Sequence, residues 1–495
     1  MDTVNKNKEK TASPTYTVEE AIETYGLGFF QLRVVGISGI LQAADAMELL
    51  LLSVLGPTLR CTWNLTPSEV ALITTIVFVG YLLGAPLWGK FSDKYGRKTC
   101  LLTVLSLIAY FGLLTTLSPT YIWVLVLRGI VGFNIGGGSS SYALMAEYLP
   151  LHHRATVLLA AQLFWAIGGS VEIGLSFLIL PRFGWRWLIF ASSLPLALFL
   201  GLLLLLPESV RYLTAANRLE EAQQIVNNIA KMNKKVEMEG SLVSSESTES
   251  SLGNIMHLFA KRYLCTSLLL PIIWFGAAFT YYGSILVSSD IFRFHSQCFG
   301  VKADPIDHHG NLTAGLTPVV DTSCCVELQT EDYTSMLVSS LGEFAILPLN
   351  IVMVNVLGRR LSLAGVYLLL AIFFIAINAC VPSTVTIVFL FILRALSSST
   401  INLVYLYTTE VYPTTIRSLG LGLFSSISRF GAMSTPYVAQ VLMPEVSVLA
   451  ALGTYSAMSV LCAIASGCLP IETKGRAMQH SVDSEIEISE ISSKN

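Results

Sequence analysis

The chain has 495 residues, of which 53% are hydrophobic and only 13% are charged, and its formal net charge is −3. An average soluble domain has about 25% charged residues, so a soluble protein of this composition would expose much apolar sequence to water. The composition therefore predicts an integral membrane protein, and the small negative charge excludes the basic field typical of nucleic-acid binders.

The chain begins with a polar stretch, and twelve apolar stretches follow it. Residues 1–33 lack the order of a cleaved signal peptide and are expected to form a cytoplasmic segment. Each apolar stretch can cross a hydrocarbon core of about 30 Å as a helix, because lipid offers no partners to unpaired backbone groups. The expected spans are 34–57, 68–89, 100–118, 121–146, 156–180, 186–206, 265–288, 334–355, 361–381, 384–408, 415–441 and 447–468.

The spacing of these stretches predicts an all-α membrane protein with two six-helix bundles. The expected parts are an N-terminal bundle (34–206), a cytoplasmic linker (207–264), a C-terminal bundle (265–468) with a long non-cytoplasmic loop (291–332), and a cytoplasmic tail (469–495). The linker should begin as an amphipathic helix, because Leu219, Ala222, Ile225 and Ile229 recur at helical spacing. Its Ser/Glu-rich second part and the tail are typical of disordered segments.

Lys and Arg predict the sidedness of the protein. They are concentrated in "GKFSDKYGRK" (89–98), in the linker, in "GRR" (358–360) and in "TKGR" (473–476). Positively charged loops face the cytoplasm, so both termini are expected on that side.

Glycosylation and disulfide candidates fall on the opposite side. Asn311 in the long loop is a candidate glycosylation site, and Asn64 is a weaker one because it lies close to the membrane. Four cysteines lie on this oxidising side: Cys61, Cys298, Cys324 and Cys325. Cys298 could pair with Cys324 or with Cys325, but spacing does not fix the pairing, and unpaired thiols are the alternative.

The second half of the chain repeats landmarks of the first. Glu147 is followed by Arg154, and the same Glu-x6-Arg spacing recurs 263 residues later at Glu410 and Arg417. "GRK" at 96–98 and Arg128 have counterparts at 358–360 and Arg394 at nearly the same offset. Parallel repeats of this kind place a transport site at the midplane, between two bundles.

These motifs resemble the major facilitator superfamily over residues 30 to 476. "GKFSDKYGRK" resembles its cytoplasmic loop signature, and "RGIVGFNIGGGSSSYALMAEYLPLHHR" resembles the helix 4 signature of sugar porters and organic-ion transporters. "PESVRYL" (207–213) and "EVYPTTIR" resemble its later motifs, and "ADAMELLLLS", "YYG" (281–283) and "LPIETKGR" are similar to the synaptic vesicle two-related proteins. The resemblance implies the major facilitator fold and transport by alternating access.

Charged residues at the expected cytoplasmic helix ends form a candidate gate. Opposite charges there can hold the helices of one bundle together, and we expect this latch to favour the outward-open state. Flanking charges that only set topology are the alternative. The candidate gate residues are Asp93, Arg97, Glu147, Arg154, Glu208, Arg211, Arg359, Glu410, Arg417 and Glu472.

Two carboxylates, Asp45 and Glu48, stand near the middle of the first span. They share one helix face, and a charged carboxylate there costs roughly 2.5–3.5 kcal/mol on insertion scales. Asp45 lies about 14 Å along its helix and Arg128 about 10 Å along the fourth, so the long arginine could reach it. By resemblance to proton-driven sugar porters, Asp45 and Arg128 are the expected proton-coupling pair. A buried ion pair that only fixes packing is the alternative.

The expected substrate cavity combines acids, aromatic groups and one further arginine. Its candidates are Glu48, Gln162, Glu172, Trp274, Tyr281, Tyr282, Glu343 and Arg429. Core packing is the alternative for the aromatic residues. Four acids, counting Asp45, against two bases favour an organic cation or zwitterion. Arg429 argues for an anion, since related organic-anion transporters also carry an arginine in helix 11.

Other functional classes find little support. The sequence shows no phosphate loop, metal-ligand spacing or nucleophile–base constellation, so neither an enzyme nor a cofactor or metal is expected. The prediction is a monomeric transporter of a small organic solute in the plasma membrane or a vesicle membrane, with protons as a candidate coupling ion. The alternative is a non-transporting receptor or vesicle regulator on a transporter scaffold, which Asn355 mildly favours because it replaces a motif aspartate.

Overall fold

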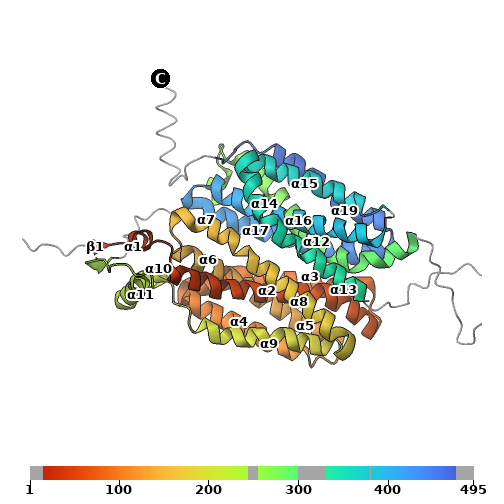
Figure 1. The fold of residues 1–495 in the computed structure, drawn as a ribbon, viewed down its shortest axis with the longest axis horizontal. Coiled ribbons are helices and arrows are strands. Elements are labelled where there is room, and N and C mark those ends of the chain that lie inside the picture. The colour runs from red at the N-terminus through yellow and green to blue at the C-terminus, as the bar shows by residue number, and fades with distance from the viewer. Residues whose placement is uncertain (1–14, 244–254, 299–329, 380, 475–495) are drawn as a thin grey trace, which may run out of the picture.

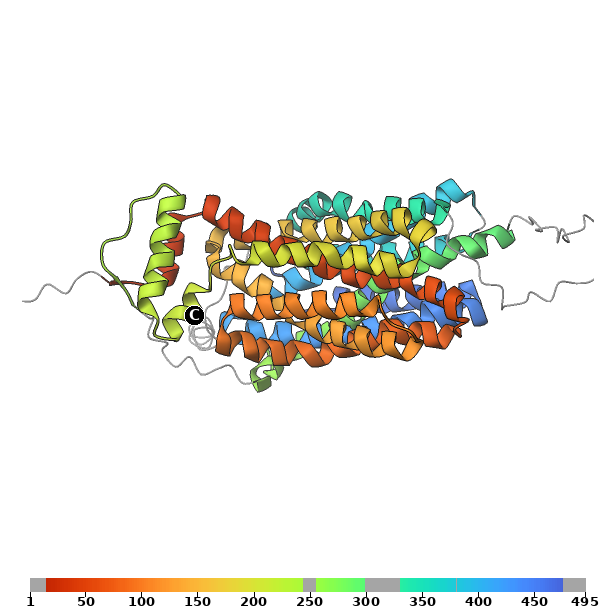
Figure 2. The ribbon, with the colours of Figure 1, turned by 90° about the horizontal axis from the view of Figure 1, so that it is seen from below.

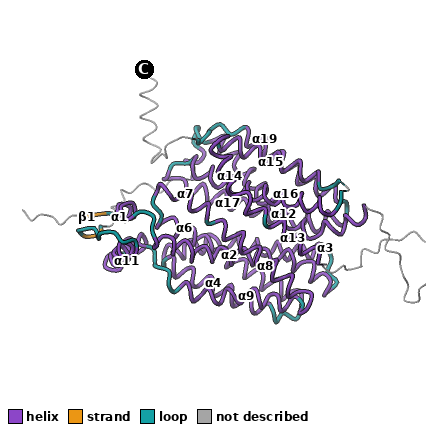
Figure 3. The backbone as a smooth tube through the Cα atoms, in the orientation of Figure 1, coloured by secondary structure: helices purple, strands orange, loops and turns teal. Residues whose placement is uncertain are grey.

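The computed structural model describes residues 15–243, 255–298, 330–379 and 381–474, and this part is almost entirely helical (Figures 1 and 3). Long helices run side by side along one axis in two groups, which we call the N-terminal and C-terminal bundles. A smaller subdomain projects from one end (Figure 2). We call this the linker end and the opposite one the far end.

The N-terminal bundle comprises six spans, two of which are interrupted by short irregular turns. Its elements are α2 (Phe29–Trp63), α3 (Pro67–Tyr95), α4 (Arg97–Thr115), α5 (Tyr121–Ile135) continued by η1 (Gly136–Gly138) and α6 (Ser139–Tyr148), α7 (Leu151–Ala160) continued by α8 (Gln162–Phe183), and α9 (Trp185–Leu203).

The C-terminal bundle has the same number of spans. Its elements are α12 (Leu264–Cys298), α13 (Thr330–Ser340) continued by α14 (Gly342–Leu357), α15 (Arg359–Ala376), α16 (Ser383–Val411), α17 (Thr414–Pro436) continued by the π-helical η3 (Tyr437–Leu442) and by α18 (Met443–Glu445), and α19 (Val448–Gly467).

The expected all-α fold with twelve spans is confirmed. Eleven helices in the described residues are long and apolar enough to cross a membrane by length and composition. The remaining span, α17 with η3, falls outside this group, and it carries Arg417, Arg429 and several serines. It still packs along α12 and α3 like the other spans.

Glycines allow the closest helix contact in the N-terminal bundle. A Cβ added to Gly84 of α3 would overlap the backbone carbonyl of Phe133, and one added to Gly132 of α5 would overlap that of Val77. Small residues let neighbouring backbones approach closely in membrane proteins. Gly84 and Gly132 therefore let α3 and α5 pack backbone to backbone.

The subdomain at the linker end joins the N-terminal segment to the linker. β1 (Thr15–Tyr16) pairs in parallel with β2 (Ser241–Leu242), and α1 (Val18–Tyr25) packs on the predicted amphipathic helix α11 (Leu219–Met232). The short helices α10 (Val210–Ala215) and η2 (Ile255–Phe259) complete the linker. The sequence prediction missed α1, although Thr17 and Glu20 form the capping box that marks its start.

Several predictions fall on residues outside the described part. These are glycosylation at Asn311, the pairing of Cys298 with Cys324 or Cys325, most of the loop 291–332, and the disordered character of residues 244–254 and of the tail after 474. Cys61 is disulfide-bonded. Asn64 caps α2 in the left-handed conformation, in a tight turn where Thr66 already caps α3.

Candidate functional site

The N-terminal bundle carries a charged cluster at the linker end. Arg97, at the start of α4, pairs with Asp93 and lies 3.4 Å from a Glu147 carboxylate oxygen at the end of α6. The other Glu147 oxygen accepts a hydrogen bond from Ser209. Glu208 accepts a 3.0 Å hydrogen bond from the backbone N–H of Lys98. The cluster therefore ties α3, α4, α6 and the start of the linker together.

The C-terminal bundle repeats this cluster at equivalent positions. Arg359 makes two hydrogen bonds to Glu410, of 2.8 and 2.9 Å. Glu472 accepts hydrogen bonds from the backbone N–H groups of Arg359 and Arg360, at 3.0 and 3.2 Å. Burial alone would raise the pKa of Glu472, but backbone donors of residues 359, 360, 473 and 474 together lower it. The carboxylate is thus held in its charged form.

The other predicted gate arginines make further contacts at the linker end. Arg154 and Arg417 each donate to the backbone carbonyl of the residue five positions earlier, Leu149 and Tyr412. Arg211 forms a 2.8 Å ion pair with Glu19 of α1. The repeat thus predicted equivalent backbone contacts for Arg154 and Arg417.

Arg128 pairs with Glu48, so the expected Asp45–Arg128 pair is wrong for this structure. An Arg128 guanidinium nitrogen lies 2.6 Å from a Glu48 oxygen, and each side chain is only 1% exposed. Arg128 stands in the half of its span nearer the far end. Glu48 lies one turn nearer that end than Asp45, and this places Glu48 at the level of the arginine.

Glu172 and Glu343 are also enclosed within their bundles. Glu172 of α8 is fully buried and accepts a 2.8 Å hydrogen bond from Ser192 of α9. Glu343 of α14 lies 2.6 Å from Arg394 of α16, in a pair that sequence analysis did not predict. Arg394 is the repeat counterpart of Arg128, and this correspondence was the sequence signal from which the pair with Glu343 could have been predicted. The placement of Glu48, Glu172 and Glu343 in a substrate cavity is therefore not supported.

Asp45 stands apart from these pairs. Its side chain is half-buried, and its carboxylate packs against Gly138, where an added Cβ would overlap it. In the described residues, no Lys, Arg or His group lies within ion-pair distance of it. Tyr142 of α6 lies near it and also beside Gln162. Of the carboxylates Asp45, Glu48, Glu172 and Glu343, Asp45 is thus the one whose charge is least compensated.

Aromatic residues of α12 join the two bundles. Trp165 of α8 donates a 2.7 Å hydrogen bond to the Tyr281 hydroxyl, which donates at 3.1 Å to Glu343. Tyr282 packs edge-on against Phe78 of α3, with ring centroids 4.6 Å apart. Tyr281 and Tyr282 therefore lie at the contact between the bundles, and their role in a substrate cavity stays a prediction. Trp274 is instead buried in the C-terminal bundle, where it donates to Thr408 at 3.0 Å.

Other contacts between the bundles lie toward the far end. Ser170 of α8 and Ser340 of α13 are 3.1 Å apart, and the Thr75 hydroxyl of α3 donates to the Met433 carbonyl at 3.3 Å. The charged clusters at the linker end are formed in this same structure. Their ion pairs lie within single bundles, and a preference for the outward-open state stays a prediction.

Arg429 of α17 also lies at the interface. It is half-buried and donates a 2.9 Å hydrogen bond to the hydroxyl of Tyr81 in the opposite bundle. Tyr282 and Tyr405 lie beside its guanidinium. Tyr81, Tyr142 and Tyr405 were not predicted as site residues, and no motif distinguished them from core aromatic residues.

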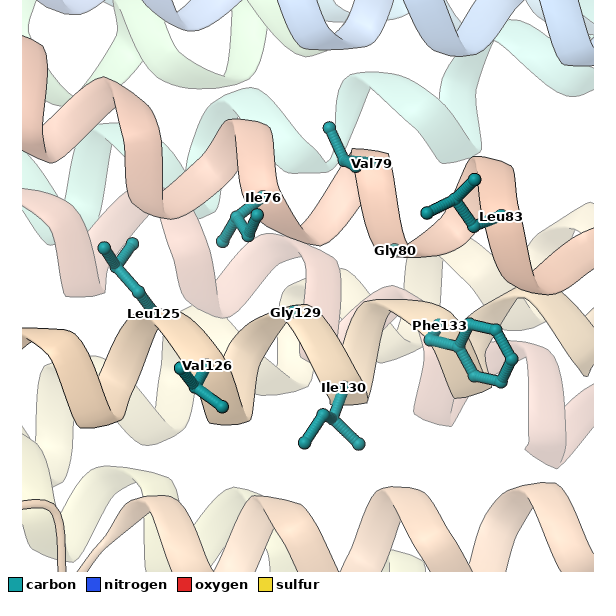
Figure 4. Close-up of a pocket in the computed structure, with 9 residues that line it drawn as sticks. All are labelled: Ile76, Val79, Gly80, Leu83, Leu125, Val126, Gly129, Ile130 and Phe133. Carbon is teal, nitrogen blue, oxygen red and sulfur yellow. The ribbon is translucent and has the colours of Figure 1, made fainter.

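A groove of about 350 Å³ lies elsewhere, between α3 and α5 (Figure 4). Its lining is entirely apolar and includes Ile76, Leu83, Val126 and Phe133. Leu83 and Val126 belong to the exposed surface of helices that are long and apolar enough to span a membrane. The groove therefore suits lipid chains and offers no group that could orient a polar solute.

Comparisons with known proteins agree with this architecture. Residues 5–294 match the family described as "Sugar (and other) transporter". Human SVOPL is 41% identical over 466 residues, covering 94% of this chain and 93% of the relative. The synaptic vesicle 2-related protein of Xenopus laevis is 40% identical over 479 residues, covering 97% and 85%.

Solved structures show the same fold at low sequence identity. A partially occluded inward-open structure of the xylose transporter XylE from E. coli has a TM-score of 0.66 at 18% identity, covering 91% of this chain and all of that one. A crystal structure of a D-xylose-proton symporter has a TM-score of 0.64 at 17% identity, covering 91% of this chain and all of that one. With the full-length relatives and the family match, these findings show that the chain belongs to the sugar (and other) transporter family of the major facilitator superfamily.

Proposed function

We propose that this chain is a proton-coupled secondary transporter, in which Asp45 takes up and releases the proton during alternating access. The observation that carries the proposal is the position of Asp45. It is a half-buried carboxylate in the middle of a span, without a cationic partner in the described residues. Charge at this depth is costly, and protonation removes that cost.

Protonation would couple to movement through the surroundings of Asp45. The side chain packs against the turn η1, which separates α5 from α6, and Tyr142 connects it to the bundle interface. A neutral Asp45 can be enclosed between the bundles at a lower free energy than a charged one. Occlusion therefore favours the protonated state, and opening toward water of higher pH favours release.

Fewer acidic side chains are available to bind a solute than the sequence predicted for the substrate cavity. Glu48 and Glu343 are neutralised by arginines, and Glu172 is enclosed between α8 and α9. A simple excess of negative charge therefore no longer supports a cation. Asp45 and Arg429 remain near the interface, so a small organic ion with an anionic group, including a zwitterion, fits better.

The alternative of a non-transporting scaffold loses its motif argument. Asn355 is exposed, and Arg359 forms its latch with Glu410 although the motif aspartate is missing. We therefore favour transport, with the linker end facing the cytoplasm. The name of the Xenopus relative supports a vesicle membrane as one host.

The test is uptake into proteoliposomes containing the purified full-length chain. A panel of labelled small organic acids, amines and zwitterions is offered with and without a pH gradient. We expect saturable uptake of one class that the gradient accelerates. Saturable uptake that ignores the gradient would overturn proton coupling, and no uptake across the panel would overturn transport.

A further inference from the structure

The span made of α17, η3 and α18 contains a π-helical turn between two prolines. The turn η3 (Tyr437–Leu442) lies between Pro436, which ends α17, and Pro444 in α18. Each proline lacks a backbone N–H and disturbs the regular α-helical hydrogen bonding around it. A π-helix is rare, and single turns of it within α-helices often occur at functional sites. The span therefore carries an irregular turn near its far end.

Gln440 lies on this turn, at a contact between the two bundles. The turn packs on α3 of the N-terminal bundle. A Cβ added to Gly56 of α2 would lie 3.3 Å from the side-chain nitrogen of Gln440 and 3.0 Å from a methyl carbon of Val70 in α3. Gly56 and Val70 belong to the halves of α2 and α3 that are nearer the far end. Gln440 therefore faces the N-terminal bundle where the far end is closed.

The amide of Gln440 is buried without compensation. The residue is 5% exposed, and neither its side-chain nitrogen nor its oxygen has a hydrogen-bond partner among the residues that the structure describes. A buried amide that loses water without gaining a partner destabilises the state that buries it. Water reaches the amide again when the bundles separate at the far end. The burial of Gln440 therefore opposes closure of the far end.

We propose that Gln440 on η3 sets the balance between the two open states of the transporter by weakening closure of the far end. Alternating access works best between two states of similar free energy, because a ligand can then shift their populations. Packing of η3 on α3 favours the closed far end, and the unpaired amide offsets part of that gain. The irregular turn also gives the helix a place to bend as the contact opens. The proposal rests on alternating access, which is part of the proposed function, but not on proton coupling or on the identity of the solute.

The test measures the distance between the bundles at the linker end. Spin labels are carried by unnatural amino acids at two exposed positions there, His152 of α7 and Leu357 of α14, so that the native cysteines are kept. Pulsed electron–electron resonance of the full-length chain in nanodiscs, without solute and at one pH, gives the populations of long and short distances. Gln440→Met removes the amide and keeps the side-chain length, so the ratio of long to short distances should rise at least roughly fivefold. Gly56→Ala crowds Gln440 and should lower this ratio.

The matched control is Ser466→Ala. The Ser466 hydroxyl is also buried without a partner in the described residues, but its helix α19 packs on helices of the C-terminal bundle. Its removal should therefore leave the distance ratio unchanged. Thermal unfolding checks the physical cause, because Gln440→Met should raise the unfolding temperature.

Four results would each overturn the assignment. These are an unchanged ratio in Gln440→Met, a shift of Gly56→Ala in the same direction as Gln440→Met, an equal shift in Ser466→Ala, and a lower unfolding temperature of Gln440→Met. Failure of solute uptake in proteoliposomes, with the expected distance shifts present, would overturn the proposed transport and leave the role of Gln440 in far-end closure supported.

Discussion

Glu48→Gln is expected to destabilise the protein strongly, because it leaves the Arg128 guanidinium buried without its carboxylate. The two groups are 2.6 Å apart and each is 1% exposed. Removing one partner of such a buried pair costs about 3–5 kcal/mol, since the remaining charge stays in a low-dielectric site. Two guanidinium nitrogens of Arg128 have no hydrogen-bond partner among the described residues. Glu172 lies near enough to interact with the Arg128 charge but makes no hydrogen bond to it, so it offsets only part of the loss.

The matched control is Asp45→Asn, one turn away on the same helix. Asp45 has no cationic partner in the described residues, so its neutral replacement should change stability by less than about 1 kcal/mol. The assay is thermal unfolding in detergent, in which the folded fraction after heating is measured as the monodisperse peak in gel filtration. The double variant Glu48→Met/Arg128→Met should recover much of the lost stability, because it removes both charges. Equal losses for Asp45→Asn and Glu48→Gln would refute this account of the buried charges.

Three further predictions concern packing and surface charge. Gly84→Ala should destabilise the protein by about 1–3 kcal/mol in thermal unfolding, because the added Cβ overlaps the Phe133 backbone. The control Gly89→Ala has open space around its Cβ and should leave stability unchanged. Equal effects of the two variants would contradict a close contact between α3 and α5. Gly138→Ala should displace the Asp45 carboxylate and shift the pH dependence of uptake. An unchanged pH profile would contradict a role of η1 in positioning the proton-binding carboxylate. The pKa of Glu472 is lower in the folded state than its unfolded value of about 4.3, so the charged carboxylate stabilises the folded state at pH above that value. This stabilisation is lost as the pH falls through the folded-state pKa. Glu472→Gln should therefore reduce the loss of thermal stability between neutral and acidic pH, and an identical slope in wild type and variant would contradict this.

The sequence predicted the twelve spans, the repeat and much of the charged clusters because each leaves a local or periodic signal. Glu147 and Glu410 share a spacing and an offset, and the structure places each beside the arginine that begins the preceding span. Hydropathy likewise located α17, although Arg429 makes it less apolar than its neighbours.

The partners of the deep charges could not be predicted in the same way. Asp45 and Glu48 share a helix face, and an arginine can reach either, so the choice depends on the relative heights of α2 and α5. The helix α2 begins at Phe29, five residues before the expected start at residue 34, which shifted every estimate of depth along it. The positions of Tyr81 and Tyr405 at the contact between the bundles could not be predicted either, because the sequence does not distinguish such a tyrosine from one packed in the core.

Uptake by the Asp45→Asn variant in proteoliposomes tests the central claim most directly. The wild type and the variant are compared for gradient-driven uptake of the solute identified in the panel, and for exchange of that solute at equal pH on both sides. Proton coupling through Asp45 predicts that the variant loses acceleration by the pH gradient while exchange continues. Acceleration of the variant equal to that of the wild type would contradict it.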